Sequence, residues 1–243
     1  MELWVLGANG TYTTAGRPTA GYLLRHEGTT LWLEAGSGTL LALQELMDPA
    51  DVDAVVISHR HSDHAIDIFM FRHYLSFGFE SSRPVPLFVP EGLADLLAGF
   101  GGSEMESTFT INTPGVDEEV AVGSMDLRFG RANHTVPTLQ LRVEAGGRAL
   151  AYSADTGIGS DLVGLAAGCN TLLCEASFQG KQKPVPHHLT AAEAAEIARE
   201  AGVERLILTH LRPTLDPQRS IEEAAAVFGG DIVVAAPGLE VLI

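Results

Sequence analysis

His59-Arg60-His61-Ser62-Asp63-His64 places three imidazoles and one carboxylate within six residues, directly after the apolar stretch at 52–58. That stretch predicts a buried strand, so the polar residues begin where the strand leaves the core. His59 and His61 are two positions apart and can point the same way, whereas Asp63 and His64 fall at the start of the next predicted helix. Imidazoles and carboxylates ligate zinc, manganese or iron, and the lack of cysteine argues against a closed structural zinc site. The segment predicts two neighbouring coordination spheres; the alternative is a solvated polar turn.

Three more potential ligands, His134, Asp155 and His210, lie where other predicted strands end. Taken singly, a histidine at such a position is as often a hydrogen-bonded loop residue as a ligand. Taken together with the segment at 59–64, their shared position favours metal ligation. A carboxylate such as Asp155 can bridge two cations. One cation would then take His59, His61, His134 and Asp155, and the other would take Asp63, His64, Asp155 and His210.

The order of these ligands, HxHxDH followed by histidine, aspartate and a strand-terminal histidine, resembles the metallo-β-lactamase superfamily from the first predicted strand to Arg212-Pro213. The resemblance implies an α/β fold, the four-layer αββα sandwich, and we expect residues 1–243 to form one such hydrolase domain. It implies two divalent cations, zinc or alternatively manganese or iron. It assigns His59, His61 and His134 to the first metal, Asp155 to the bridge, and Asp63, His64 and His210 to the second. In this family the turn at 34–38 usually carries aspartate where this chain has Glu34.

Apolar periodicity and turn residues predict secondary structure that agrees with such a sandwich. Strands are expected at 2–7, 20–26 and 30–35, and the region 107–153 is expected to be rich in strands. A hairpin is expected at Gly146-Gly147, where glycine supplies the positive φ of a tight turn. Helices are expected at 39–47, at about 65–77 and near 217–228, and a further one begins at Thr190, with Glu193 completing a capping box and Gly202 ending it.

Two comparisons within the superfamily narrow the implied chemistry. True β-lactamases use cysteine in place of the bridging aspartate and lack the equivalent of His64, so this chain does not resemble them closely. Glyoxalase II-like thioesterases share all seven ligands but usually present the His134 equivalent within GHTPG-like sequence. The stretch Ala132-Asn133-His134-Thr135-Val136-Pro137 resembles instead the ribonuclease Z and phosphodiesterase branch.

A histidine just before the capped helix points to the same branch. His188 matches the position of the ribonuclease Z histidine that protonates the leaving group, and His187 is the less favoured neighbour. The resemblance therefore implies that His188 is a catalytic acid, while Asp63 orients the attacking hydroxide or accepts its proton. The alternative is that His188 only terminates the helix or hydrogen-bonds its own loop.

The substrate is expected to be a small phosphodiester, such as a cyclic nucleotide. Ribonuclease Z carries a long arm that grips transfer RNA, commonly between the His134 and Asp155 equivalents, where this chain has only a hairpin. The formal net charge of −16, from 31 acidic and 15 basic residues, also disfavours long nucleic acid. Thioesterase or lactonase activity, ribonuclease Z-like RNA processing, and a non-catalytic metal-binding sensor are the alternatives.

Composition and hydropathy also indicate the size of the core, the compartment and the state of the cysteines. With 243 residues, 46% of them hydrophobic, the chain can bury a large core. It has neither a signal-peptide pattern nor an apolar run long enough to span a membrane, and we expect a cytoplasmic protein without membrane association. Cys169 and Cys174 are expected to be buried free thiols. The branch resemblance suggests a homodimer.

Overall fold

The computed structural model describes residues 1–78, 83–102, 104–181 and 183–243. Within these ranges the strands form two seven-stranded sheets. The first sheet has the order β14-β1-β2-β3-β4-β5-β6. Its strands are β1 (Glu2–Gly7), β2 (Gly21–His26), β3 (Thr29–Leu33), β4 (Ala54–Val56), β5 (Val85–Phe88), β6 (Phe109–Asn112) and β14 (Glu240–Leu242).

The second sheet has the order β13-β12-β11-β10-β9-β8-β7. Its strands are β7 (Glu119–Val122), β8 (Met125–Arg131), β9 (Leu139–Ala145), β10 (Arg148–Tyr152), β11 (Thr171–Glu175), β12 (Arg205–Thr209) and β13 (Asp231–Val234). The helices are α1 (Thr39–Gln44), α2 (Ser62–Ala65), α3 (Asp67–Gly78), α4 (Leu93–Gly101), α5 (Glu104–Thr108), α6 (Leu162–Ala166), α7 (Ala191–Ala201) and α8 (Pro217–Ala225), with a 3₁₀ turn at Pro49–Asp51.

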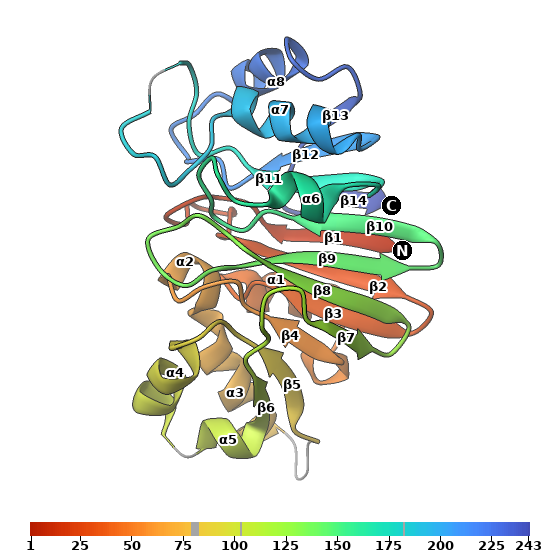
Figure 1. Ribbon diagram of the computed structural model, residues 1–243. Coiled ribbons are helices and arrows are strands. Elements are labelled where there is room, and N and C mark those ends of the chain that lie inside the picture. The colour runs from red at the N-terminus through yellow and green to blue at the C-terminus, as the bar shows by residue number, and fades with distance from the viewer. Residues whose placement is uncertain (79–82, 103, 182) are drawn as a thin grey trace.

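Alternating side chains divide the buried residues into layers. Along β2, Tyr22 and Leu24 join the core between the two sheets, whereas Leu23 belongs to the cluster under the N-terminal helices. In β3, Leu31 faces the sheet interface and Trp32 faces the helices. This period of two is expected for strands covered on both faces. Helices α3, α4 and α5 lie at one end of Figure 1 and α7 and α8 at the other, so the expected four-layer αββα sandwich is confirmed.

Parallel strands bring the functional loops to one end of the sandwich. β3, β4, β5 and β6 run parallel to one another in the first sheet, and β10, β11, β12 and β13 do so in the second. The carboxyl ends of parallel neighbours meet at the same edge, where ligand sites of α/β proteins usually lie. The segment at 59–64 follows β4 and therefore opens onto this edge.

Several predicted elements differ in extent from the observed ones. The strand expected at 52–58 is paired only over Ala54–Val56, and the helix expected at 39–47 ends at Gln44. The helix expected at about 65–77 is α3, and a separate short helix, α2, directly precedes it. The break between them has a tertiary cause, because the N–H of Asp67 donates to the carbonyl of Ala35 at 2.9 Å rather than continuing α2.

The predicted hairpin and helix cap are confirmed. β9 and β10 pair antiparallel around Gly146 and Gly147, which have φ of 58° and 75°. At α7, the Thr190 hydroxyl accepts from the N–H of Glu193 at 3.2 Å, and the Glu193 carboxylate accepts from the N–H of Thr190 at 2.8 Å. The cap fixes the loop that precedes α7, because Lys183 contacts both Glu193 and the carbonyl of His188.

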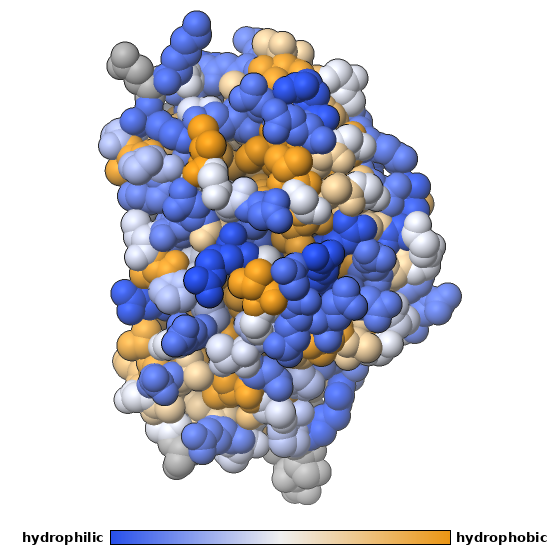
Figure 2. Space-filling view, viewed as in Figure 1, coloured by the Kyte–Doolittle hydropathy of each residue, from blue (hydrophilic) through white to orange (hydrophobic). Residues whose placement is uncertain are grey.

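Both cysteines, Cys169 and Cys174, are buried and free, as expected. Hydrophilic side chains cover much of the face seen in Figure 2, with smaller hydrophobic areas between them. In the ranges that the structure covers, we find no helix with the length and apolar character needed to cross a bilayer.

Removing the side-chain hydrogen bond of the α7 N-cap tests how much it contributes to stability. We expect Thr190→Ala to lower the free energy of unfolding by about 1 kcal/mol, because the N–H of Glu193 loses its acceptor at a buried helix start. Urea denaturation followed by circular dichroism measures the loss. The control is Thr190→Ser, which keeps the hydroxyl and should lose less than half as much. Equal losses in both variants would show that the methyl group, rather than the hydrogen bond, stabilises this helix end.

Candidate metal centre

Four segments, one from the first sheet and three from the second, supply the predicted ligands. His59 and His61 follow β4, and Asp63 and His64 lie in α2. The other three come from the second sheet: His134 lies between β8 and β9, Asp155 follows β10, and His210 follows β12. The structure brings all seven into one cluster, so that potential ligand atoms of His59, His61, His134 and Asp155 lie within 4.8 Å of one another, as do those of Asp63, His64 and His210.

The first group has ring nitrogens at ligand spacing. His59 Nε2 lies 3.0 Å from His61 Nδ1, which lies 3.3 Å from His134 Nε2. Two nitrogens that share a tetrahedral zinc lie about 3.3 Å apart, given a Zn–N distance near 2.0 Å. The Asp155 carboxylate completes the group, with its Oδ2 atom 3.8 Å from His59 Nε2. These distances fit one cation among the four side chains.

The second group is built around His64 and His210, both buried. Their Nε2 atoms are 3.2 Å apart, and His210 Nε2 lies 3.3 Å from Asp63 Oδ2. Asp155 faces this group as well, because its Oδ1 atom is 3.3 Å from His64 Nε2 and 3.4 Å from His210 Nε2. Asp155 therefore directs one carboxylate oxygen toward each group, as the bridging assignment requires.

Contacts behind the rings orient the nitrogens. His134 Nδ1 lies 3.2 Å from the carbonyl of His187, so Nδ1–H donates and Nε2 keeps its lone pair. Ser177 gives its hydroxyl proton to Glu175 at 2.6 Å and accepts from His210 Nδ1 at 2.9 Å, which likewise leaves Nε2 of His210 free. Such partners fix the tautomer of metal-binding histidines.

Burial and charge set the protonation states. Burial lowers the pKa of His59, His61 and His134, so these rings are neutral near pH 7 and able to ligate. Burial also lowers the pKa of His64, but the charges of Asp155 and Glu34 outweigh it and raise that pKa well above its usual value. The buried carboxylates thus favour positive charge at this point.

The chemistry of the donor set fits divalent metal binding. Among the residues that the structure covers, the buried Asp155 Oδ1 and His64 Nδ1 atoms form no hydrogen bond of normal geometry, although Oδ1 lies 3.3 and 3.4 Å from the Nε2 atoms of His64 and His210. A buried carboxylate oxygen without a partner is costly, and a cation would satisfy it. The cluster holds no cysteine, which is typical of catalytic rather than structural sites.

His188, the predicted acid, lies beside the cluster. Potential ligand atoms of His188, Asp155 and His210 lie within 4.8 Å of one another. Its Nδ1 atom is 2.9 Å from Glu175 Oε1. Burial lowers the pKa of His188, but the hydrogen bond and charge of Glu175, together with Asp155, outweigh it, so the pKa lies above its ordinary value. His188 is therefore suited to hold a proton next to the cluster.

Sequence reasoning did not assign a role to Glu175. This buried carboxylate ends β11, accepts from the N–H of Thr156 at 2.7 Å and contacts both His188 and Ser177. A charged residue at the end of an apolar strand was the available signal. Thr11 was also not identified: its N–H donates to Asp63 Oδ2 at 2.8 Å and orients that carboxylate.

Close packing and unusual backbone surround the ligands. Ala154 and His210 have φ of 48° and 55°, in the left-handed region that costs non-glycine residues free energy. Gly10 lies against His210, where an added Cβ would come within 2.5 Å of the carbonyl oxygen of His210. Glycine is required there because any side chain would displace the ligand loop.

Comparison with known proteins agrees with this geometry. A model of the beta-lactamase superfamily domain matches residues 29–211. An uncharacterized protein of Mycobacterium tuberculosis is 35% identical over 247 residues, covering 96% of this chain and 88% of that protein. Ribonuclease Z of Methanopyrus kandleri is 29% identical over 273 residues, covering 97% and 95%.

A third relative has a crystal structure. The probable metallo-hydrolase YhfI of Bacillus subtilis is 27% identical over 98% of both chains. The crystal structure of this metallo-beta-lactamase fold protein matches with a TM-score of 0.91 over 99% of both chains, at 24% identity. At this identity the structural match supports the fold alone.

Isosteric substitution tests metal binding. We expect Asp155→Asn to weaken zinc binding at least about tenfold, because the carboxylate that faces both groups loses its charge. Titration calorimetry on chelator-treated protein measures the affinity. The control Asp161→Asn changes an exposed carboxylate outside the cluster and should bind zinc as the wild type does. Unaltered zinc affinity in Asp155→Asn would contradict its assignment as a ligand.

Proposed function

The chain belongs to the beta-lactamase superfamily and is a metal-dependent hydrolase. On this basis, we propose that it is a dinuclear phosphodiesterase acting on small phosphodiesters such as cyclic nucleotides. The two cations would be held by His59, His61 and His134 on one side and by Asp63, His64 and His210 on the other, with Asp155 between them. Zinc is the proposed metal.

The observation that carries this proposal is the contact between His188 and Glu175 next to the ligand cluster. When a phosphodiester of an alcohol is cleaved, the departing alkoxide requires a proton. A thiolate departs more readily without a proton, because thiols are more acidic than alcohols. Glu175 binds Nδ1 of His188 at 2.9 Å and leaves Nε2 to deliver the proton. A protonated imidazole held by a carboxylate beside the metal ligands is suited to an alkoxide leaving group.

Other residues take roles that follow from their contacts. When bound, the cations would polarise the phosphoryl group and lower the pKa of water toward neutrality. Asp63, held by the N–H of Thr11 at 2.8 Å, would orient the attacking nucleophile or accept its proton. The His188 imidazolium would also stabilise negative charge that develops on the phosphoryl oxygens.

The shape and charge of the chain favour a small substrate. The interval between His134 and Asp155 holds only the β9–β10 hairpin, which turns at Gly146-Gly147. The net charge of −16 repels a polyanion at long range. These features support a small diester over folded RNA, although ribonuclease Z is among the relatives.

The same proposal includes assembly and compartment. Leu41, Met70 and Phe77 are 70%, 59% and 77% exposed and line one apolar surface beside α1 and α3. An exposed apolar surface of this kind supports a homodimer. A cytoplasmic location stays a prediction from the sequence.

A substrate panel tests the reaction class. We expect zinc- or manganese-loaded protein to hydrolyse 3′,5′-cyclic nucleotides at least about tenfold faster than thioesters, because an alkoxide leaving group needs the proton that His188 can supply and a thiolate does not. Bis(p-nitrophenyl) phosphate and lactones are assayed beside them to separate cleavage at phosphorus from cleavage at a carbonyl carbon. Release of p-nitrophenol and chromatography of nucleotides measure turnover. Preferred turnover of thioesters or lactones would replace this function by the alternative hydrolase activity, and lack of any hydrolysis would favour a sensor.

Substitution of the proton donor tests the mechanism. We expect His188→Ala to keep its bound metal but to lose about 10²-fold or more in kcat with cyclic nucleotides. The neighbour His187→Ala is the matched control, because the hydrogen bond that orients His134 is accepted by the backbone carbonyl of residue 187 and survives the substitution. The His187 ring only packs against His134 and His188, so this variant should stay near wild-type activity. Unchanged kcat in a metal-replete His188→Ala variant would remove His188 from the mechanism.

A further inference from the structure

A pocket of about 530 Å³ opens next to the metal cluster, and His134 is one of its lining residues. Three segments at the same end of the sandwich form it, at 90–91 after β5, at 113–116 after β6 and at 131–139 from the last residue of β8 to the first of β9. Its volume lies in the range of small-molecule sites. A substrate with its phosphoryl group at the cluster would therefore extend into this pocket.

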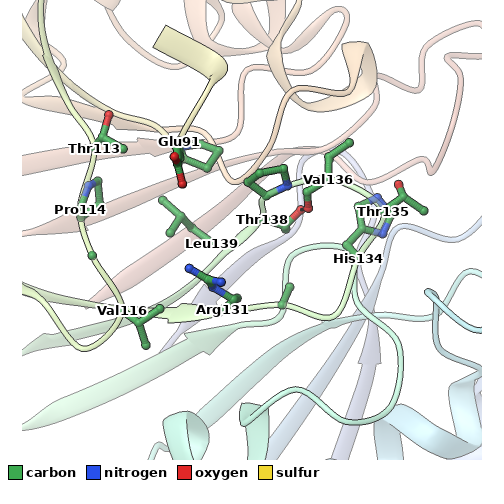
Figure 3. A pocket seen from close by; sticks show the side chains of 14 residues that line it. Glu91, Thr113, Pro114, Val116, Arg131, His134, Thr135, Val136, Thr138 and Leu139 are labelled. Atoms are coloured by element: carbon green, nitrogen blue, oxygen red, sulfur yellow. Dashed lines mark hydrogen bonds between the residues drawn. The ribbon is translucent and has the colours of Figure 1, made fainter.

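The pocket contains two opposite charges. Glu91 and Arg131 project from opposite sides of Leu139 toward the interior, as Figure 3 shows. Within the described part of the chain, which leaves out residues 79–82, 103 and 182, the side chains of Glu91 and Arg131 form no hydrogen bond or ion pair. Arg128, on the same strand as Arg131, differs in this respect because it pairs with Asp117 at 2.7 Å.

The charges suit a neutral group that both donates and accepts hydrogen bonds. A guanidinium alone would favour a second phosphate, but the Glu91 carboxylate in the same pocket repels an anion. A donor and an acceptor together match the edge of a nucleobase, where an amino group lies next to a ring acceptor. Pro90, Pro114 and Val136 add apolar wall surface on which a planar ring can pack.

We propose that this pocket binds the base of a cyclic nucleotide that carries an exocyclic amine on a purine, with Glu91 accepting from the amine and Arg131 donating to a ring acceptor or carbonyl. The assignment rests on the proposed phosphodiesterase function and names its substrate class. Glu91 and Arg131 thereby act as specificity residues, and the metal ligands and His188 perform the reaction.

The test compares substrates that differ only in the proposed contacts. Glu91→Gln and Arg131→Gln are assayed with 3′,5′-cyclic AMP, with the 3′,5′-cyclic phosphate of purine riboside, which lacks the amine, and with bis(p-nitrophenyl) phosphate. We expect each variant to raise KM for cyclic AMP about tenfold, because a charge-assisted hydrogen bond is lost, with kcat nearly unchanged. Arg128→Gln and Glu119→Gln, which lie outside this pocket, are the matched controls and should keep wild-type KM values.

The substrate analogues identify which contact is lost. Glu91→Gln should leave KM for cyclic purine riboside phosphate unchanged, and both variants should hydrolyse bis(p-nitrophenyl) phosphate as the wild type does. Equal rises in KM for all three substrates would overturn base recognition and indicate a general anion contact. If both variants keep the wild-type KM for cyclic AMP, base recognition by Glu91 and Arg131 is refuted, whereas the proposed phosphodiesterase activity is not. Wild-type protein that cleaves only bis(p-nitrophenyl) phosphate would instead refute cyclic nucleotides as substrates, and the pocket assignment with them.

Discussion

The attraction between the buried carboxylate of Asp155 and the imidazoles around it is the constraint on which the rest of the site depends. Asp155 lies 3.8 Å from His59, 3.3 Å from His64 and 3.4 Å from His210. Burial alone would raise the pKa of this carboxyl, but His210, His64 and His59 hold it well below its usual value. A buried carboxylate is stable only if neighbouring polar or positively charged groups compensate its charge. This requirement fixes the positions of the loops that carry the surrounding imidazoles.

Local backbone is adapted to this arrangement. Ala154 precedes Asp155 in a left-handed conformation, and both His210 and Glu34 adopt positive φ. Residues in such conformations persist only where surrounding contacts over-determine them. The sheets supply that support, because β10, β11 and β12 pair in parallel just before the loops begin. Left-handed backbone therefore occurs at His210 and directly before Asp155, while the strands β10, β11 and β12 that precede these loops pair in regular register.

Much of this could be predicted from sequence because the signals are local. The spacing of His59 and His61 after an apolar strand, the Gly146-Gly147 turn, and the Thr190 capping box each depend on a few adjacent residues. The break between α2 and α3 could not, since it results from a bond between Asp67 and the distant Ala35. The Glu175 contact to His188 and the pocket shared by Glu91 and Arg131 likewise exist only after separate loops meet.

The division of the ligands between the two sheets has a consequence for assembly of the molecule. Four of the proposed ligands come from residues that follow β4, and three come from loops of the second sheet. Neither half of the chain alone contains the full set of proposed ligands, so a cation that uses all of them would bind only after the two sheets have docked. A bound metal would then connect the two sheets across their interface. Metal binding would follow the completion of folding rather than initiate it.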